Sequence, residues 1–277
     1  MEVKLTTLSE NTAGRVGLLA EWGLSVLVEV DGYKVLLDTG LGISTFYNAA
    51  VMGIDLSQID KIVLSHGHRD HTGGLRHVLQ ASRKQMDIIA HPDIWTSKYS
   101  RTFGKQEQYA GIPHAREALE DLGARFKLTE EPVWVADNIV TTGEIPLQTE
   151  YEKIDAELYV KEDGQLVPDP LKDDLALIIK SPDGLVVVLG CGHRGIMNTL
   201  HRARELTGVD HIRMVIGGTH LIQASRERLD LTIVELRELG VERLGISHCT
   251  GLPAASVLFQ EFGDSFFFNN AGRVVTI

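Results

Sequence analysis

Apolar side chains recur along the chain with two different periods, and these periods predict alternating strands and helices. Val3 to Leu8 is typical of a strand, and Leu24 to Val30 and Tyr33 to Leu37 are the two arms of a predicted hairpin. Asp31-Gly32 separates the arms, and both residue types tolerate the positive φ of a two-residue turn. The chain therefore begins with three strands.

Helical periodicity enters after the predicted hairpin. Ser44 to Met52 is typical of a short helix that ends before Gly53, and Ile62 to Leu64 is a short buried strand followed by a helix over about 74–82. Smaller elements are expected next: a strand at Met86 to Ala90, a helix at Ala115 to Leu122, and extended segments at Arg125 to Leu128 and Val133 to Val140.

The segment Ile145 to Lys172 differs from the rest of the chain in composition and periodicity. It contains three prolines and many acidic residues, and it keeps neither the period of a strand nor that of a helix. We interpret it as a long loop that serves as a surface excursion or as a lid over a binding site. Tyr151 and Tyr159 would give such a lid flat surfaces for a ligand.

The second half of the chain repeats the order of the first. Leu175 to Lys180, a turn at Asp183-Gly184 and Leu185 to Leu189 form another predicted hairpin, followed by a helix over Ile196 to Leu206 and a strand over Ile212 to Ile216. Three pairs of corresponding positions have nearly the same spacing: Asp31 and Asp183, Asp38 and Cys191, His66 and His220.

Two similar halves of strands followed by helices predict an α/β fold in which two sheets stack centrally and helices cover both outer faces. We therefore expect a four-layer αββα sandwich formed by one domain, residues 1–277. The end of the chain predicts a helix at Arg226 to Glu238, a strand at Leu244 to Ser247, a helix at Pro253 to Phe262 and a closing hairpin over Phe266 to Ile277.

Charge and composition narrow the function classes. The 277 residues carry 27 Lys and Arg against 38 Asp and Glu, a formal net charge of −11. This balance disfavours nucleic acid or an anionic membrane as a partner. The first residues lack the pattern of a signal peptide, and the most apolar run is too short to span a bilayer, so we expect a cytoplasmic protein with no membrane contact. Two cysteines, Cys191 and Cys249, exclude a disulfide framework.

The strongest chemical signal is His66-x-His68-x-Asp70-His71, which places three imidazoles and a carboxylate directly after a buried strand. A tight loop can aim His66 and His68 at one metal ion while Asp70 and His71 turn toward a second. Neutral imidazole binds zinc, iron or manganese, and a carboxylate compensates charge. The pattern predicts one or two divalent metal ions, with zinc preferred.

The run Ser-His-Gly-His-Arg-Asp-His-Thr-Gly-Gly at 65–74 resembles the metal-binding signature of the metallo-β-lactamase superfamily. The resemblance covers the chain, because the strand that ends in Asp38 and the late strand that ends in His248 come in the family's order. It implies His66 and His68 as ligands of one metal and Asp70, His71 and His248 as ligands of the other. Motifs around Thr142, Cys191, His220 and His248 resemble the branch named after dihydropterin ribofuranosylaminobenzene 5′-phosphate synthase.

The chain departs from the family pattern at its centre. The strand Leu185 to Gly190 ends in Cys191 where the family has a bridging Asp, and the usual preceding His is absent near Asp174. Three residues are therefore candidates for the remaining metal ligand: His193, which we favour, Cys191 and Asp174.

Other residues receive supporting assignments. The resemblance implies that Asp38 does not bind the metal itself but supports the metal-binding loop, by accepting hydrogen bonds from a ligand His or from backbone amides. His220 should lie at the same rim as His66, where it orients substrate or donates a proton. Cys249 is assigned to packing. Arg194, Thr250 and the helix start near Pro253 are candidates for binding an anionic group.

These residues predict a metal-dependent hydrolase that acts on a small phosphorylated or heterocyclic metabolite, with Asp70 and His220 as catalytic residues. The resemblance to the named branch implies a second reading, a synthase that couples a pterin to an aminobenzene. A third reading is a metal- or pterin-binding sensor without turnover. A homodimer is expected from family analogy.

Overall fold

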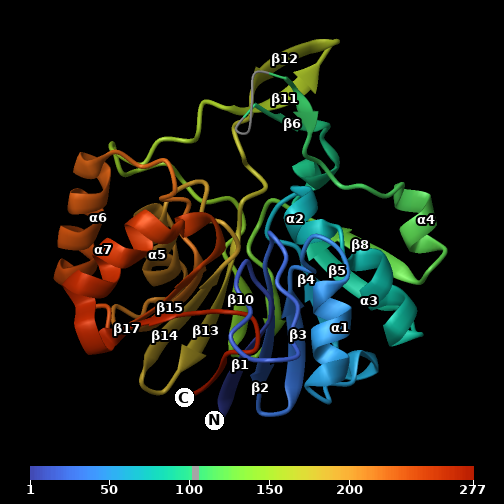
Figure 1. Cartoon of the computed structure of the whole chain (residues 1–277), viewed down its shortest axis with the longest axis horizontal. Coiled ribbons are helices and arrows are strands. Elements are labelled where there is room, and N and C mark those ends of the chain that lie inside the picture. Colours follow the sequence, from blue (N-terminus) through green and yellow to red (C-terminus); the bar gives the residue numbers. More distant parts are fainter. Residues whose placement is uncertain (102–105) are drawn as a thin grey trace.

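The computed structural model describes residues 1–101 and 106–277. In these ranges the chain forms two sheets of seven strands, which stack face to face (Figure 1). The first sheet has the order β18-β1-β2-β3-β4-β5-β8: Val274–Thr276, Val3–Ser9, Ser25–Val30, Tyr33–Leu37, Lys61–Val63, Met86–Ala90 and Ala124–Leu128. The second has the order β17-β16-β15-β14-β13-β10-β9: Phe266–Phe268, Arg243–Ser247, Ile212–Gly218, Gly184–Leu189, Ala176–Ser181, Ile139–Thr141 and Trp134–Ala136.

Strand periodicity builds a core on each face of each sheet. In β14, Val186 and Val188 point into the core between the sheets, where they join Val26 and Val28 of β2. The intervening side chains of β14, Leu185, Val187 and Leu189, point to the helices on the outside. Because both faces are covered, β14 is apolar and buried at every position.

Helices cover the two outer faces, as the sequence predicts. The first sheet is covered by α1 (Ser44–Val51), α3 (Leu75–Ser82) and α4 (Arg116–Glu120), and the second by α5 (Ile196–Thr207), α6 (Arg226–Glu238) and α7 (Leu252–Phe262) (Figure 1). The four-layer αββα architecture is therefore confirmed. Single 3₁₀ turns lie at Leu56–Gln58, Pro92–Trp95, His248–Thr250 and Gly263–Ser265.

The two halves share one topology. An antiparallel hairpin, β2 and β3, leads into the parallel strands β4 and β5, and the hairpin β13 and β14 leads into the parallel strands β15 and β16. In the first hairpin Asp31 and Gly32 have φ of 49° and 86°, as the predicted turn requires.

The predicted closing hairpin at the end of the chain is wrong. β17 pairs in parallel with β16 in the second sheet, whereas β18 pairs antiparallel with β1 in the first. Both strands add to an edge of the sandwich, and the connection between them crosses from one sheet to the other. Each strand thereby satisfies the edge hydrogen-bonding groups of a different sheet, which a local hairpin would leave open.

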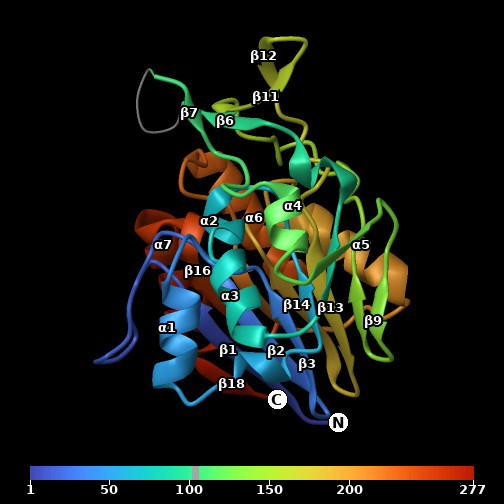
Figure 2. The same cartoon turned by 90° about the vertical axis from the view of Figure 1, so that its right-hand side faces the viewer.

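The interpretation of Ile145 to Lys172 as a loop without strands also needs correction. It contains β11 (Leu158–Glu162) and β12 (Gln165–Pro168), which join β6 (Lys98–Ser100) and β7 (Gln108–Tyr109) in a third sheet of order β12-β11-β6-β7. The turn between β11 and β12 is Asp163-Gly164, an Asp-Gly pair of the kind that marks hairpins. This small sheet stands over one edge of the sandwich, opposite the edge where the termini lie (Figures 1 and 2).

Candidate metal centre

The carboxyl ends of the central strands meet at the edge of the sandwich beneath the third sheet. His66 and His68 follow β4, Cys191 and His193 follow β14, His220 follows β15 and His248 follows β16. Parallel strands deliver the residues that follow them to one edge, which is where α/β proteins place ligand sites. Elements far apart in the sequence thus bring their histidines together.

His66, His68 and His193 form the first group. His66 Nε2 lies 2.9 Å from His68 Nδ1 and 3.2 Å from His193 Nε2. All three side chains are buried. Two atoms bound to zinc in a tetrahedral site lie about 3.3 Å apart, so these spacings match a shared ion.

His193 reaches this group because a carboxylate holds its loop. Asp174 Oδ2 accepts a hydrogen bond from the backbone N–H of Arg194 at 2.9 Å. Of the three open candidates, the structure brings His193 to His66 and His68, whereas Asp174 binds the backbone beside His193 and Cys191 lies against His71.

Asp70, His71 and His248 form the second group. His71 Nε2 lies 3.1 Å from His248 Nε2, and Asp70 Oδ2 lies 3.3 Å from His248 Nε2 and 3.9 Å from His71 Nε2. Asp70 and His71 lie in a short helix that the sequence pattern did not reveal, α2 (Arg69–Thr72), which begins directly after His68. The two groups therefore come from one motif but face different points.

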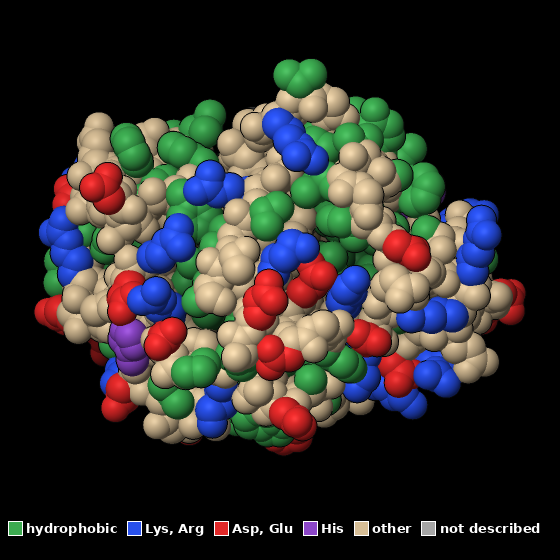
Figure 3. Space-filling model, turned by 90° about the horizontal axis from the view of Figure 1, so that it is seen from below, with side chains coloured by type: hydrophobic (Ala, Val, Ile, Leu, Met, Phe, Trp, Pro, Cys, Tyr) green, Lys and Arg blue, Asp and Glu red, His purple; other side chains and the backbone are tan. Residues whose placement is uncertain are grey.

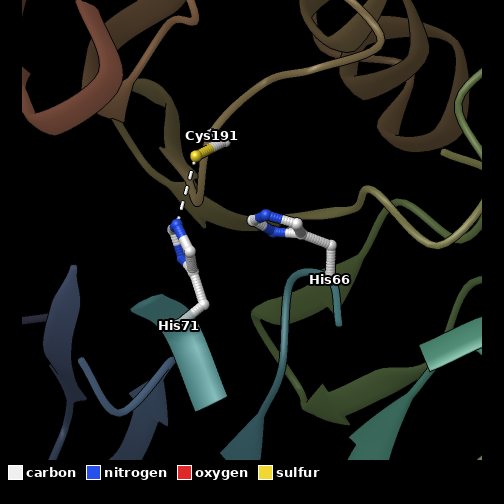
Figure 4. A group of neighbouring side chains, drawn as sticks. All are labelled: His66, His71 and Cys191. Carbon is white, nitrogen blue, oxygen red and sulfur yellow. Dashed lines mark hydrogen bonds between the residues drawn. The ribbon is translucent and has the colours of Figure 1, made fainter. Parts of the chain in front are cut away.

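Cys191 lies between the groups. Its Sγ is 3.1 Å from His71 Nε2, and with His66 and His71 it forms a cluster whose potential ligand atoms lie within 4.8 Å of one another (Figure 4). A thiol stands here at the strand end where the resemblance implied a bridging carboxylate. Cys249 is buried, and its Sγ donates to the carbonyl of Cys191 at 3.4 Å.

Asp38 supports both groups from behind, as the sequence predicted. One carboxylate oxygen lies 2.6 Å from His71 Nδ1 and also accepts from the Ser65 hydroxyl at 2.6 Å, while the other accepts from the Ser65 backbone N–H at 2.7 Å. The Ser65 hydroxyl in turn lies 2.9 Å from His66 Nδ1. Asp38 thereby orients one imidazole of each group.

The local electrostatics differ between the groups. Burial and neighbouring imidazoles hold the pKa of His66 and of His193 well below the usual range, and burial lowers the pKa of His68 to about 3, so these rings are neutral donors of lone pairs. Burial also lowers the pKa of His71, but the carboxylates of Asp38 and Asp70 outweigh burial and raise it to about 9. The second group therefore has a negative potential that favours a cation.

His220 lies at the rim that its position in the repeat predicted, with its ring centroid 4.1 Å from that of His193. Its Nε2 is 3.6 Å from Asp155 Oδ2, and Asp155 belongs to the segment that precedes β11. His220 has a positive φ of 48°, which bends the chain sharply after β15. Sequence reasoning missed Asp155, since nothing in its local pattern marks it.

A pocket with a volume of about 390 Å³ opens over both groups. His68, Asp70, His193, His220 and His248 line it, together with residues that the sequence did not single out: Trp22, Leu41, Tyr109, Leu158 and Ile222. Tyr109 and Leu158 come from the third sheet, so part of the predicted lid segment forms a wall of the pocket.

The residues predicted to bind an anion have other contacts. The guanidinium of Arg194 donates to the carbonyl oxygens of Ile145 and Pro170, and Thr250 is hydrogen-bonded to Thr219. Neither residue lines the pocket. Arg194 instead fastens both ends of the 145–172 segment to the sandwich.

Comparisons with known proteins identify the family of this chain. The model of the metallo-β-lactamase superfamily matches residues 23–199, the part of the chain that holds every candidate ligand except His248. The chain belongs to the metallo-β-lactamase superfamily. Within the described residues of this superfamily member, no helix has the length and apolar character needed to cross a membrane.

Individual relatives are similar over nearly the full length. A protein of Methanocaldococcus jannaschii, named 7,8-dihydropterin-6-methyl-4-(β-D-ribofuranosyl)-aminobenzene-5′-phosphate synthase, is 35% identical, and the match covers 99% of this chain and 96% of that protein. The crystal structure of Tm1679, described as a metal-dependent hydrolase of the β-lactamase superfamily, is 30% identical with a TM-score of 0.85 and covers 99% and 98% of the two chains.

More distant structures share the fold alone. Zn²⁺-bound PqqB from Methylobacterium extorquens has a TM-score of 0.58 at 13% identity, covering 98% of this chain and 99% of that one.

Proposed function

We propose that this protein is a metal-dependent hydrolase that acts on a small phosphorylated or heterocyclic metabolite. The observation that carries the proposal is that four members of two potential ligand groups, His66/His68/His193 and Asp70/His71/His248, line one pocket of about 390 Å³: His68, His193, Asp70 and His248. Metal ions held by these residues would lie next to a substrate bound in the pocket.

The donor set fits divalent metals. The first group offers three neutral imidazoles, and the second offers two imidazoles and a carboxylate next to the Cys191 thiol. Imidazole and thiolate together favour zinc, and imidazole with carboxylate also suits iron or manganese. When bound, such ions act as Lewis acids and lower the pKa of coordinated water.

The chain's own residues would position the ligands and the substrate. Asp38 and Ser65 fix the ring orientations of His71 and His66 through hydrogen bonds of 2.6 and 2.9 Å. Asp70, which lines the pocket beside the second group, would orient the attacking water by accepting a hydrogen bond from it. His220, held near Asp155, would donate a hydrogen bond to the substrate's leaving oxygen.

The shape of the pocket supports a small substrate. Its volume lies at the low end of the range for sites that hold drug-sized ligands, about 300–1,000 Å³. Trp22, Leu158 and Ile222 give it apolar walls, which suit the ring of a heterocycle better than a chain of phosphates. The net charge of −11 also disfavours a nucleic acid.

A second candidate function is the coupling of a pterin diphosphate to a ribosylated aminobenzene phosphate, in which the bond from the pterin to its diphosphate breaks, the bond to the aminobenzene forms, and diphosphate and a proton leave. The name of the relative with 35% identity favours it. The same metal centre would serve this reaction by stabilising charge on the reacting groups.

Two measurements test these functions. Plasma mass spectrometry gives the metals per chain after purification without added metal or chelator, and the protein is then incubated with esters, lactones, phosphodiesters and, separately, a pterin diphosphate with the aminobenzene phosphate. Hydrolysis that His68→Ala abolishes together with metal, but His211→Ala retains, supports the first proposal. Coupled product without hydrolysis would replace it with the second, and tight metal binding without any turnover would replace both with a sensor.

A further inference from the structure

Two residues that follow β1 contact His248, a candidate metal ligand of the second group. Glu10 and Asn11 come directly after β1, which runs from the edge of the sandwich where the termini lie to the edge that holds the metal centre (Figure 1). The face at the start of β1, seen from below in Figure 3, shows scattered acidic, basic and hydrophobic side chains and little histidine. The strand thus delivers Glu10 and Asn11 to the edge where the histidines of both groups gather.

Glu10 and Asn11 hold the backbone of His248 on both sides. A carboxylate oxygen of Glu10 accepts a hydrogen bond from the His248 N–H at 2.8 Å, and Asn11 Nδ2 donates to the His248 carbonyl at 3.3 Å. His248 has a φ of 54°, a left-handed conformation that is uncommon for a residue with a side chain. The two bonds stabilise this bend at the end of β16, where the ring of His248 faces His71.

The side-chain amide of Asn11 also contacts the ring of His248. Its Oδ1 lies 3.0 Å from His248 Nδ1 and accepts from the Gly23 N–H at 3.1 Å. Because the Gly23 N–H can only donate and the His248 carbonyl can only accept, one orientation of the amide satisfies both. In that orientation Oδ1 faces the ring, and an amide oxygen cannot donate. His248 Nδ1 must therefore carry the proton.

A proton on Nδ1 leaves the lone pair of His248 Nε2 free to bind a cation. Nε2 is the atom that faces the second group, 3.1 Å from His71 Nε2 and 3.3 Å from Asp70 Oδ2. We propose that Asn11 is a positioning residue of the metal centre, which selects the tautomer of His248 that binds a cation through Nε2. This role rests on the metal-dependent function proposed above and deepens it, since Asn11 orients His248 as Asp38 orients His71.

The peptide at Gly23 gives Asn11 a fixed anchor. A Cβ atom at Gly23 would lie 2.3 Å from the carbonyl oxygen of Asp70, so the two backbones are in direct contact. Trp22, which precedes Gly23, lines the pocket, and its ring meets that of His248 edge to face with centroids 5.5 Å apart. Asn11 therefore joins the pocket wall at Trp22 to the second group.

Zinc titrations of the full chain against a chelator test this role. The binding step that His248→Ala removes reports on the second group, and Asn11→Ala should weaken that step about 10- to 100-fold, the usual effect of losing a residue that orients a ligand. The step of the first group should not change, which shows that the variant is folded. Asn138→Ala, in the turn between β9 and β10, is the matched control and should keep both steps.

Asn11→Asp separates the contact with the ring from the contact with the backbone. It keeps an acceptor for the N–H of His248 Nδ1 but loses the donor to the His248 carbonyl, so it should bind the second zinc ion more tightly than Asn11→Ala does. Equal weakening in both variants would assign Asn11 to backbone support alone and overturn the proposal.

Nuclear magnetic resonance of the zinc-loaded protein with isotope-labelled histidine reads the tautomer directly. Long-range proton–nitrogen correlations should show the proton of His248 on Nδ1 in the parent protein, with the His248 signals assigned by comparison with His248→Ala. A proton on Nε2, or a parent chain whose second group takes up no zinc, would overturn the proposal. Both measurements are made without substrate, so a protein that binds zinc in this way and hydrolyses nothing would refute the proposed hydrolase and support the role of Asn11.

Discussion

The carboxylate of Asp173 accepts a hydrogen bond from the backbone N–H of Gly67 at 2.7 Å, at the residue between His66 and His68. The other oxygen of Asp173 is 2.9 Å from the Nζ atom of Lys98, which is fully buried and also binds Asp169 at 2.9 Å. A Cβ atom at Gly67 would lie 2.5 Å from the carbonyl oxygen of Ile94 and 3.0 Å from Lys98 Cε. A buried ionic cluster thus fixes the loop that carries the first ligand group.

We expect Lys98→Met to weaken both the fold and the metal centre. Removal of the ammonium leaves two buried carboxylates without their positively charged partner, which costs on the order of 3–5 kcal/mol. The free energy of unfolding in urea and the metal affinity measured by competition with a chelator should both fall. Lys4→Met removes an ion pair whose lysine is 40% exposed, and it should change neither quantity by more than about 1 kcal/mol. Equal effects from both variants would contradict the prediction.

Single histidine substitutions should separate the two groups. His193→Ala removes one donor of the first group, and His248→Ala removes one of the second. Each variant should therefore lose about one metal ion per chain, while the group that was not changed retains its ion. Plasma mass spectrometry gives the count. His114→Ala, in which the lost imidazole is hydrogen-bonded to the carbonyl of Gly73 rather than to either group, serves as the control with unchanged metal content. Loss of a metal from His114→Ala, or full loading of His193→Ala, would argue against the two groups.

Cys191 should be visible as a ligand in the cobalt-substituted protein. Its Sγ lies 3.1 Å from His71 Nε2, within reach of an ion shared with the second group. We expect a sulfur-to-cobalt charge-transfer band in the near ultraviolet that Cys191→Ser abolishes. Cys249→Ser should retain the band, because the Cys249 thiol is engaged by the Cys191 carbonyl. A band that survives in Cys191→Ser would assign the thiolate to Cys249 instead.

Glu152 ties the segment between the sandwich and the third sheet to the start of α5. Its carboxylate accepts from the N–H groups of Met197 and Asn198 at 2.9 and 2.8 Å. Glu152→Ala leaves these buried donors without a partner, at a cost of about 1–3 kcal/mol in the free energy of unfolding. Replacement of the exposed Glu238 by Ala on α6 should be nearly neutral. A urea titration compares the variants.

The contribution of Glu152 should depend on pH. Burial outweighs the two backbone hydrogen bonds and raises the pKa of Glu152 in the folded state. A raised folded pKa gives stability that is complete below the unfolded pKa and declines as pH rises through the folded value. The free energy of unfolding of the parent protein minus that of Glu152→Gln should therefore be largest in acid and fall toward neutral pH. A difference that grows toward neutral pH would reverse this assignment.

The sequence by itself determined the order of strands and helices, the αββα architecture and the motif at 66–71. These features are local: the period of apolar residues sets each element, and a buried strand followed by His66-x-His68-x-Asp70-His71 fixes the chemistry of its own loop. The helix at Arg226–Glu238 has the predicted bounds because its periodicity and its cap at Ser225 both lie within the segment.

Only the tertiary structure decided which residue joins His66 and His68 in the first group, which strands β17 and β18 pair with, and which residues form the walls of the pocket. The local pattern favoured His193 but left Cys191 and Asp174 open, and their different contacts in the structure separate the three. β17 and β18 belong to different sheets, and β11 pairs with β6 across a long stretch of chain, so their partners are set by contacts remote in sequence. Pairing of this kind depends on which sheet edges are open after folding, and no local period encodes that.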